Sequence, residues 1–275
     1  MEHDKLGNLR ARALSAAVLG PLVLGAVYAG GWLFQALIGA GAVLAVREWV
    51  RMVAPLPAGR SFLISSCVAI GLIVATYLFV GPIPALALAF ALAPALGLIA
   101  GFCRAGLSGV DRRVGAFAIP YIGTSSIALM WLRDGSGGTI MICFLLLSVW
   151  ANDIGGYVVG RSVGGPKLAP SISPAKTWSG FIGGVIASAM VGGGLAVATG
   201  AHHPLVAVAL GIVLAVVGQG GDLLESAVKR RYGVKDSGGL IPGHGGLLDR
   251  IDGLLAAAPA LALFHAAAGS TMAWW

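Results

Sequence analysis

The chain has few charged residues, few cysteines and no long polar linker. Only 11% of its 275 residues are charged, whereas 57% are hydrophobic, and the mean hydropathy is +0.90. This composition excludes an ordinary soluble domain. The three cysteines, Cys67, Cys103 and Cys143, lie far apart without CxxC spacing, so we interpret them as packing residues. Neither GxxxxGK[ST] nor GxGxxG occurs, so neither a P-loop nor a Rossmann nucleotide site is indicated.

Long apolar runs predict an all-α, polytopic integral membrane protein with about nine transmembrane helices. We expect one membrane domain over residues 1–275, with N-terminal helices in 1–135 and a catalytic half in 136–275. Glycines in two of the runs, at 183–184 and 192–194, predict close packing between helices. Breaks at Gly, Pro and charged residues place the helices near 13–30, 33–46, 62–80, 83–102, 115–132, 139–158, 178–199, 204–228 and 245–268.

The basic residues predict how the chain is oriented in the membrane. All but two of the 18, Arg133 and Arg250, fall in the N-terminal tail or in alternate loops. Because cytoplasmic loops carry excess Lys and Arg, this predicts a cytoplasmic N-terminus. The same placement accounts for the net charge of +7 without nucleic-acid binding. The first 30 residues also resemble a secretory signal, and an uncleaved first helix is the preferred interpretation.

Acidic side chains fall inside the predicted helices, where an ionised carboxylate needs a cation, a metal or a water-filled cavity. Asp222, Glu225 and Ser226 share one helix face through i, i+3, i+4 spacing, and Asp249 and Asp252 share a face of the last helix. Hard oxygen ligands of this kind suit Mg²⁺ together with substrate phosphates. Alternatively, Glu225 and Lys229, or Asp249 and Arg250, neutralise each other. Asp153 adds a fifth acid at the end of the sixth predicted helix.

The segment 232–246 contains six glycines and reads as a loop that approaches an anion closely. We expect free N–H groups at the start of the last helix to bind phosphate, assisted by Lys229, Arg230 and Lys235. His244 is either a phosphate ligand, a proton shuttle or a residue that orients the loop.

A second polar group follows the sixth predicted helix. Ser171, Ser173, Lys176 and Thr177 lead into the next helix, and Pro174 is consistent with its first turn. The N-terminus of that helix would direct donors at an anion. For Lys176, anion binding and simple orientation charge are equally favoured.

The segment 226–252, SAVKRRYGVKDSGGLIPGHGGLLDRID, resembles the signature of the phosphatidate cytidylyltransferase (CDP-diacylglycerol synthase) family. The matching positions are Ser226, Lys229-Arg230, Lys235-Asp236, Pro242, His244-Gly245-Gly246, Asp249-Arg250 and Asp252. The resemblance extends upstream through Asn152-Asp153, Gly160-Arg161, Ser173 to Thr177, and Asp222. The first five predicted helices resemble the family only in hydropathy and length.

This resemblance implies that CTP and phosphatidate react to give CDP-diacylglycerol and pyrophosphate at the cytoplasmic face of the inner (plasma) membrane. It implies Mg²⁺, a second, monovalent cation such as K⁺, and a homodimer. Asp222 and Asp249 are the expected metal ligands. The expected catalytic residues are Asp222, Lys229, Arg230, Lys235, Asp236, His244 and Asp249. The expected substrate-binding residues are Asp153, Arg161, Ser173, Lys176, Thr177, Ser226, Arg250 and Asp252.

Two other functions are compatible with parts of the pattern. A CTP-dependent lipid kinase would share the membrane, the nucleotide and the metal, but it would release CDP. A cation-coupled transporter would explain intramembrane acids, but it predicts acids at the bilayer midplane in two related halves. Here the acids crowd into one half.

Overall fold

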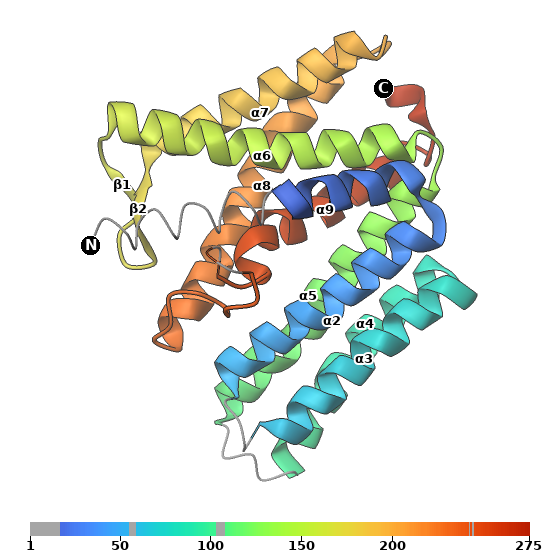
Figure 1. Ribbon diagram of the computed structural model, residues 1–275, viewed down its shortest axis with the longest axis vertical. Coiled ribbons are helices and arrows are strands. Elements are labelled where there is room, and N and C mark those ends of the chain that lie inside the picture. Colours follow the sequence, from blue (N-terminus) through green and yellow to red (C-terminus); the bar gives the residue numbers. More distant parts are fainter. Residues whose placement is uncertain (1–16, 55–58, 103–107, 242, 244) are drawn as a thin grey trace. The chain divides into compact units, whose positions relative to one another are not determined.

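A computed structural model describes residues 17–54, 59–102, 108–241, 243 and 245–275 (Figure 1). Over these residues the chain forms nine α-helices, one two-stranded hairpin and a short 3₁₀ turn. The all-α class is therefore confirmed. The helices span Ala17–Ala29, α2 Gly31–Val53, α3 Arg60–Phe79, α4 Pro82–Phe102, α5 Gly109–Asp134, α6 Gly138–Val163, α7 Trp178–Ala198, α8 Pro204–Arg231 and α9 Leu248–Ala267; the strands are β1 Lys167–Ala169 and β2 Ser173–Thr177, and the 3₁₀ turn is Met272–Trp274.

Seven of these helices are long and apolar enough to cross a membrane, namely α2, α3 and α5 to α9. A helix satisfies its own backbone hydrogen bonds, so it can cross hydrocarbon without exposing unpaired polar groups. The Ala17–Ala29 helix and the apolar part of α4, Pro82–Leu98, are shorter. The chain is therefore a polytopic membrane protein.

The chain divides into two compact units. The first contains residues 1–130 and 232–251, and the second contains residues 131–231 and 252–275. The Gly-rich loop and Asp249 thus belong to the first unit, whereas Asp222 belongs to the second.

In the first unit, α2 packs on α3 and α3 packs on α4. Helix α5 joins them: Trp49 Nε1 of α2 donates to the carbonyl of Val114 at 2.9 Å. A Cβ at Gly115 of α5 would lie 2.5 Å from the ring of Phe62 in α3, so only glycine allows this approach. The largest buried side chains of this unit include Trp49, Phe34 and Phe62.

In the second unit, glycines bring α6, α7 and α8 into close contact, as the sequence predicts. A Cβ at Gly183 of α7 would lie 2.5 Å from Val159 Cβ, and one at Gly184 would lie 2.5 Å from Asn152 Oδ1. Between α7 and α8, a Cβ at Gly192 would lie 2.6 Å from the Ala207 carbonyl oxygen. Backbone thus packs against backbone across these interfaces.

A hairpin precedes α7, where the sequence predicts a loop and a helix start (Figure 1). Pro174 lies in β2 and not in the first turn of a helix, so that expectation was wrong. The helix begins at Trp178 because Thr177 caps it: the Thr177 hydroxyl accepts from the Gly180 amide at 3.1 Å. The N–H of Trp178 donates to the Pro166 carbonyl at 3.0 Å, which closes the base of the hairpin.

Candidate active site

One group of candidate site residues, in the first unit, lies around the loop that leads into α9. Asp249 lies in the first turn of α9, and its carboxylate accepts hydrogen bonds from the loop that precedes this helix. Asp249 Oδ2 accepts from the Ser237 amide at 2.9 Å, the Ser237 hydroxyl at 3.0 Å and the Gly246 amide at 2.9 Å. A carboxylate at a helix N-terminus is stabilised by free N–H groups and the helix dipole. Asp249 is thus held in a defined orientation by the fold.

Glu48 is a second carboxylate at this loop, and the sequence reasoning missed it. It lies on α2, is only 6% exposed, and accepts from the amides of Leu247 at 3.1 Å and Leu248 at 2.9 Å. The second helix was expected to end near residue 46, so Glu48 was read as part of a loop. Helix α2 instead continues to Val53. Only two apolar residues, Trp49 and Val50, separate Glu48 from Arg51, so the sequence carries no clear signal for this role.

The N–H groups at the start of α9 therefore do not point freely at an anion, in contrast to the sequence expectation. The amides of Gly246, Leu247 and Leu248 donate to Asp249 and Glu48. Lys235 and Asp236 in the same loop are exposed, as is Arg250 in α9. His244 and Pro242 lie outside the described residues.

A separate group of candidate site residues, in the second unit, gathers around Asp222 of α8. Lys176 Nζ of β2 lies 2.5 Å from Asp222 Oδ2, and both side chains are partly exposed, at 25% and 31%. The Ser226 hydroxyl donates to Asp222 Oδ1 at 3.2 Å, one turn further along α8. Asp252 lies within electrostatic range of both Asp222 and Asp153. Three carboxylates and a lysine are thus close together in the second unit.

Two buried side-chain amides, Asn152 and Gln219, form a hydrogen bond close in sequence to these acids. Asn152 of α6 accepts from Gln219 Nε2 of α8 at 2.8 Å, and the same nitrogen lies 3.3 Å from the Phe181 carbonyl of α7. Both amides are buried, at 5% and 9% exposed. Asn152 is next to Asp153 in α6, and Gln219 lies one turn before Asp222 in α8. The hydrogen bond between the two amides therefore holds α6 and α8, which carry these acids, in a fixed relative position.

Three residues that the sequence predicts to bind an anion contact other groups of the chain, and their roles in binding stay predictions. Lys229 Nζ lies 3.1 Å from Glu225 Oε1, and both side chains are almost fully buried. This ion pair agrees with the neutralising alternative, and the catalytic role of Lys229 stays a prediction. Arg230 Nε donates to the Ile172 carbonyl at 3.2 Å, which ties α8 to the hairpin. The Thr177 hydroxyl caps α7.

The other predicted site residues lie in helices, strands and loops of both units. Arg161 lies in α6 and donates to the Tyr157 hydroxyl at 2.8 Å, and Ser173 begins β2. The predicted site residues of the second unit are Asp153, Arg161, Ser173, Lys176, Thr177, Asp222, Ser226, Lys229, Arg230 and Asp252; those of the first are Lys235, Asp236, Asp249 and Arg250. The pairing of Asp222 with Asp249 at one metal stays a prediction from the sequence. Within the described part of the chain, no three His, Cys, Asp or Glu side chains form a ready-made metal site.

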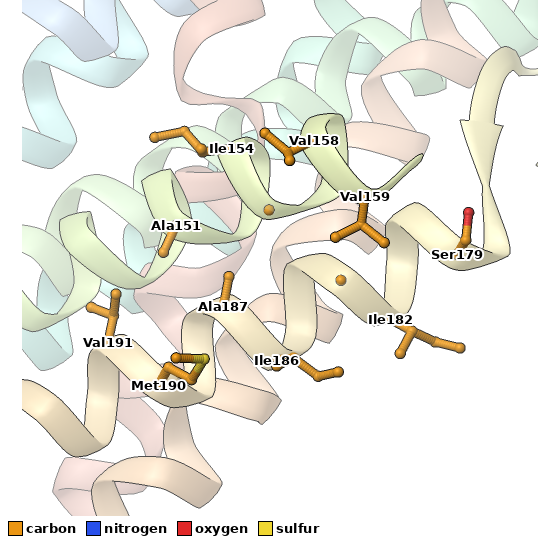
Figure 2. Close-up of a pocket in the computed structure, with 12 residues that line it drawn as sticks. Ala151, Ile154, Val158, Val159, Ser179, Ile182, Ile186, Ala187, Met190 and Val191 are labelled. Atoms are coloured by element: carbon orange, nitrogen blue, oxygen red, sulfur yellow. The ribbon is translucent and has the colours of Figure 1, made fainter. Parts of the chain in front are cut away.

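An apolar cavity of about 830 Å³ lies between α6 and α7 in the second unit (Figure 2). Its walls are aliphatic side chains such as Ile154 and Val158 of α6 and Ile182 and Ile186 of α7. In Figure 2, Ser179 lies at the end where the hairpin strand enters α7. The four aliphatic side chains named are each more than half exposed.

These features define a polytopic helical membrane protein in which carboxylates and cations form two polar groups, one in each compact unit. The chain belongs to the Cytidylyltransferase family, whose sequence model matches residues 10–268. It is 41% identical to the phosphatidate cytidylyltransferase of Brucella suis over 265 residues, which cover 95% of this chain and 94% of that protein. It is 43% identical to the phosphatidate cytidylyltransferase of Staphylococcus saprophyticus over 148 residues, or 53% of this chain and 57% of that protein. The Escherichia coli protein YnbB, an uncharacterized protein, is 45% identical over 132 residues, or 46% of this chain and 43% of that protein.

Proposed function

We propose that the chain transfers the cytidylyl group of CTP to phosphatidate, which yields CDP-diacylglycerol and pyrophosphate for phospholipid synthesis. The observation that carries this proposal is the similarity to a phosphatidate cytidylyltransferase over nearly the whole length of both chains. The polar groups around Asp222 and Asp249, in a protein that is otherwise apolar, support it independently.

The reaction requires positioning and charge neutralisation more than proton transfer. A phosphate oxygen of phosphatidate, ionised at neutral pH, attacks the α-phosphorus of CTP, and the bond from that phosphorus to the bridging oxygen breaks. Pyrophosphate leaves with the electron pair. Because the nucleophile is already an anion, no strong base is needed, and oriented cations can supply much of the acceleration.

The donor chemistry of the site fits Mg²⁺, which prefers one or two carboxylates and shares its remaining positions with water and phosphate. Asp222 and Asp249 would hold the ion, as the sequence predicts. When bound, Mg²⁺ supplies neutralisation of phosphate charge. A monovalent cation such as K⁺ and a homodimer remain part of the proposal from family resemblance.

The residues of the chain have separate roles in this proposal. Lys176 is partly exposed beside Asp222, so its ammonium is placed to exchange the carboxylate for a phosphate oxygen. Exposed Lys235 contributes charge to the triphosphate. Lys229 and Arg230 act mainly by holding Glu225 and the hairpin.

The acyl chains of phosphatidate need an opening to the bilayer. The apolar cavity between α6 and α7 offers such a surface, and Ser179, one of its lining residues, follows closely after Lys176 in the chain. The placement of basic residues supports a site on the cytoplasmic side of the plasma membrane.

One assay tests the proposal and its rival. Purified protein with labelled CTP and phosphatidate should form labelled CDP-diacylglycerol and an equal amount of pyrophosphate, and chelation of Mg²⁺ should stop both. Release of CDP with a phosphorylated lipid would instead identify a CTP-dependent lipid kinase.

A further inference from the structure

Glu48 has no role in the reaction described above, yet it makes specific contacts with the loop that precedes Asp249. Its Oε1 accepts from the Leu247 amide at 3.1 Å, and its Oε2 accepts from the Leu248 amide at 2.9 Å. Leu248 is the first residue of α9. An anion at this position satisfies N–H groups that the helix itself leaves unpaired.

Glu48 and Asp249 hold the same serine from two sides. The Ser237 hydroxyl oxygen lies 3.1 Å from Glu48 Oε2 and 3.0 Å from Asp249 Oδ2. A serine hydroxyl has one proton to donate, so the two carboxylates share it. A displacement of the Glu48 carboxylate therefore changes the hydrogen bonding of Asp249.

The loop is closed tightly around the Glu48 carboxylate. A Cβ at Gly238 would lie 2.8 Å from Glu48 Oε1, and one at Gly246 would lie 2.6 Å from Glu48 Oε2. Two glycines of the loop are thus needed for the approach of this particular side chain, which comes from a helix about 190 residues earlier in the chain.

We propose that Glu48 is a positioning residue that fixes the loop and the first turn of α9, so that Asp249 keeps one orientation. Its effect on turnover rests on the proposed cytidylyl transfer; its effect on the loop does not. Glu48 acts through Ser237, Leu247 and Leu248, and it does not touch a substrate.

The first experiment measures hydrogen–deuterium exchange in the full-length, detergent-solubilised protein without metal. Glu48→Gln replaces one carboxylate oxygen by an amide group that cannot accept, so at least one of the Leu247 and Leu248 amides loses its partner. We expect an amide that loses its partner to exchange about tenfold faster, the factor that a hydrogen bond to a charged group contributes. Trp49→Phe is the matched control, because it removes the hydrogen bond of the adjacent residue to Val114 and keeps the Glu48 carboxylate.

The second experiment measures the Mg²⁺ concentration that gives half the maximal rate of CDP-diacylglycerol formation. A smaller fraction of folded enzyme lowers the rate but leaves this concentration unchanged. We expect Glu48→Gln to raise it about tenfold and Trp49→Phe to leave it unchanged. Ser237→Ala should raise this Mg²⁺ concentration less than Glu48→Gln does. In the double variant the two increases should not multiply in full, because both substitutions act through Asp249.

Exchange in Glu48→Gln equal to that of the wild type, or an equal increase in Trp49→Phe, would overturn the proposal. If Glu48→Gln does not fold, Ser237→Ala decides: an unchanged Mg²⁺ requirement refutes the coupling. If the wild type forms no CDP-diacylglycerol, the proposed reaction fails, and the exchange result still decides the role of Glu48.

Discussion

Substitution of Asp249 by Asn removes the negative charge of this side chain but keeps an oxygen that can accept the hydrogen bonds of the loop. The side-chain oxygen of Asn can retain the three hydrogen bonds that Asp249 Oδ2 accepts, from the Ser237 amide and hydroxyl and from the Gly246 amide. The 3.2 Å contact from the Ser237 amide to Oδ1 is lost. The loop should therefore keep its conformation.

The structure sets the expected magnitudes. A hydrogen bond to a charged acceptor contributes about 2 kcal/mol and a neutral one about 1 kcal/mol, so three weakened bonds cost at most about 3 kcal/mol. Partial exposure of Asp249 reduces this value, since water can compensate. Loss of a preorganised charge at the reacting centre should lower kcat about 100- to 1,000-fold. Activity should fall far more than stability.

The assay follows labelled lipid formed from CTP at saturating Mg²⁺, together with the thermal unfolding midpoint in the same detergent. Asp249→Ala is the informative comparison, because it removes the acceptor of the Ser237 and Gly246 amides, while the Ser237 hydroxyl keeps Glu48 Oε2. It should unfold at a lower temperature than Asp249→Asn. Turnover of Asp249→Asn near that of the wild type would remove Asp249 from the metal-binding role.

Three further changes test other parts of the structure. Lys235→Ala should raise the CTP concentration needed for half-maximal rate several-fold, because about 1 kcal/mol of charge interaction is lost, and kcat should change little. An unchanged CTP saturation curve would exclude Lys235 from the triphosphate site. Gly184→Ala should lower stability by about 1–3 kcal/mol in thermal unfolding, because the new Cβ would lie 2.5 Å from Asn152 Oδ1. Its control Gly194→Ala, with open space around the Cβ, should be neutral or stabilising by up to about 1 kcal/mol; equal losses in both would contradict the close-packing argument. Trp274→Phe should cost about 1 kcal/mol through its 3.1 Å hydrogen bond to His265 Nδ1, without changing CTP saturation; a thermal midpoint equal to that of the wild type would show that this bond contributes nothing.

Hydropathy and the spacing of glycines predicted the helices and their close packing because both signals are local. A run of about 20 apolar residues is readable wherever it occurs, and Gly183 and Gly184 indicate close contact even before the partner helix is known. The acid at 222 was identified in the same way, by its position in an apolar helix.

Local patterns predicted few partners of the polar groups. The pairing of Glu225 with Lys229 near the end of α8 was only an alternative from their spacing, and no local pattern predicted the contact of Arg230 with the Ile172 carbonyl, which depends on the hairpin. The hairpin itself was missed because its strands are short and contain Pro174 and Lys176 rather than an alternating apolar pattern.

Glu48 was missed for a different reason. Its neighbours in the sequence, Arg47 and Arg51, suggest an ordinary interfacial charge, whereas its hydrogen-bonding partners lie far along the chain. No spacing rule connects residues at such a separation.

The separation between Glu48 and Leu248 also has a consequence for biosynthesis. The two residues are 200 positions apart, and a ribosome adds about 5–20 residues per second. Glu48 therefore exists for about 10–40 s before the amides that bind it have been made. During that time α2 carries an unpartnered carboxylate close to the membrane, and the loop of the candidate site becomes ordered only near the end of translation.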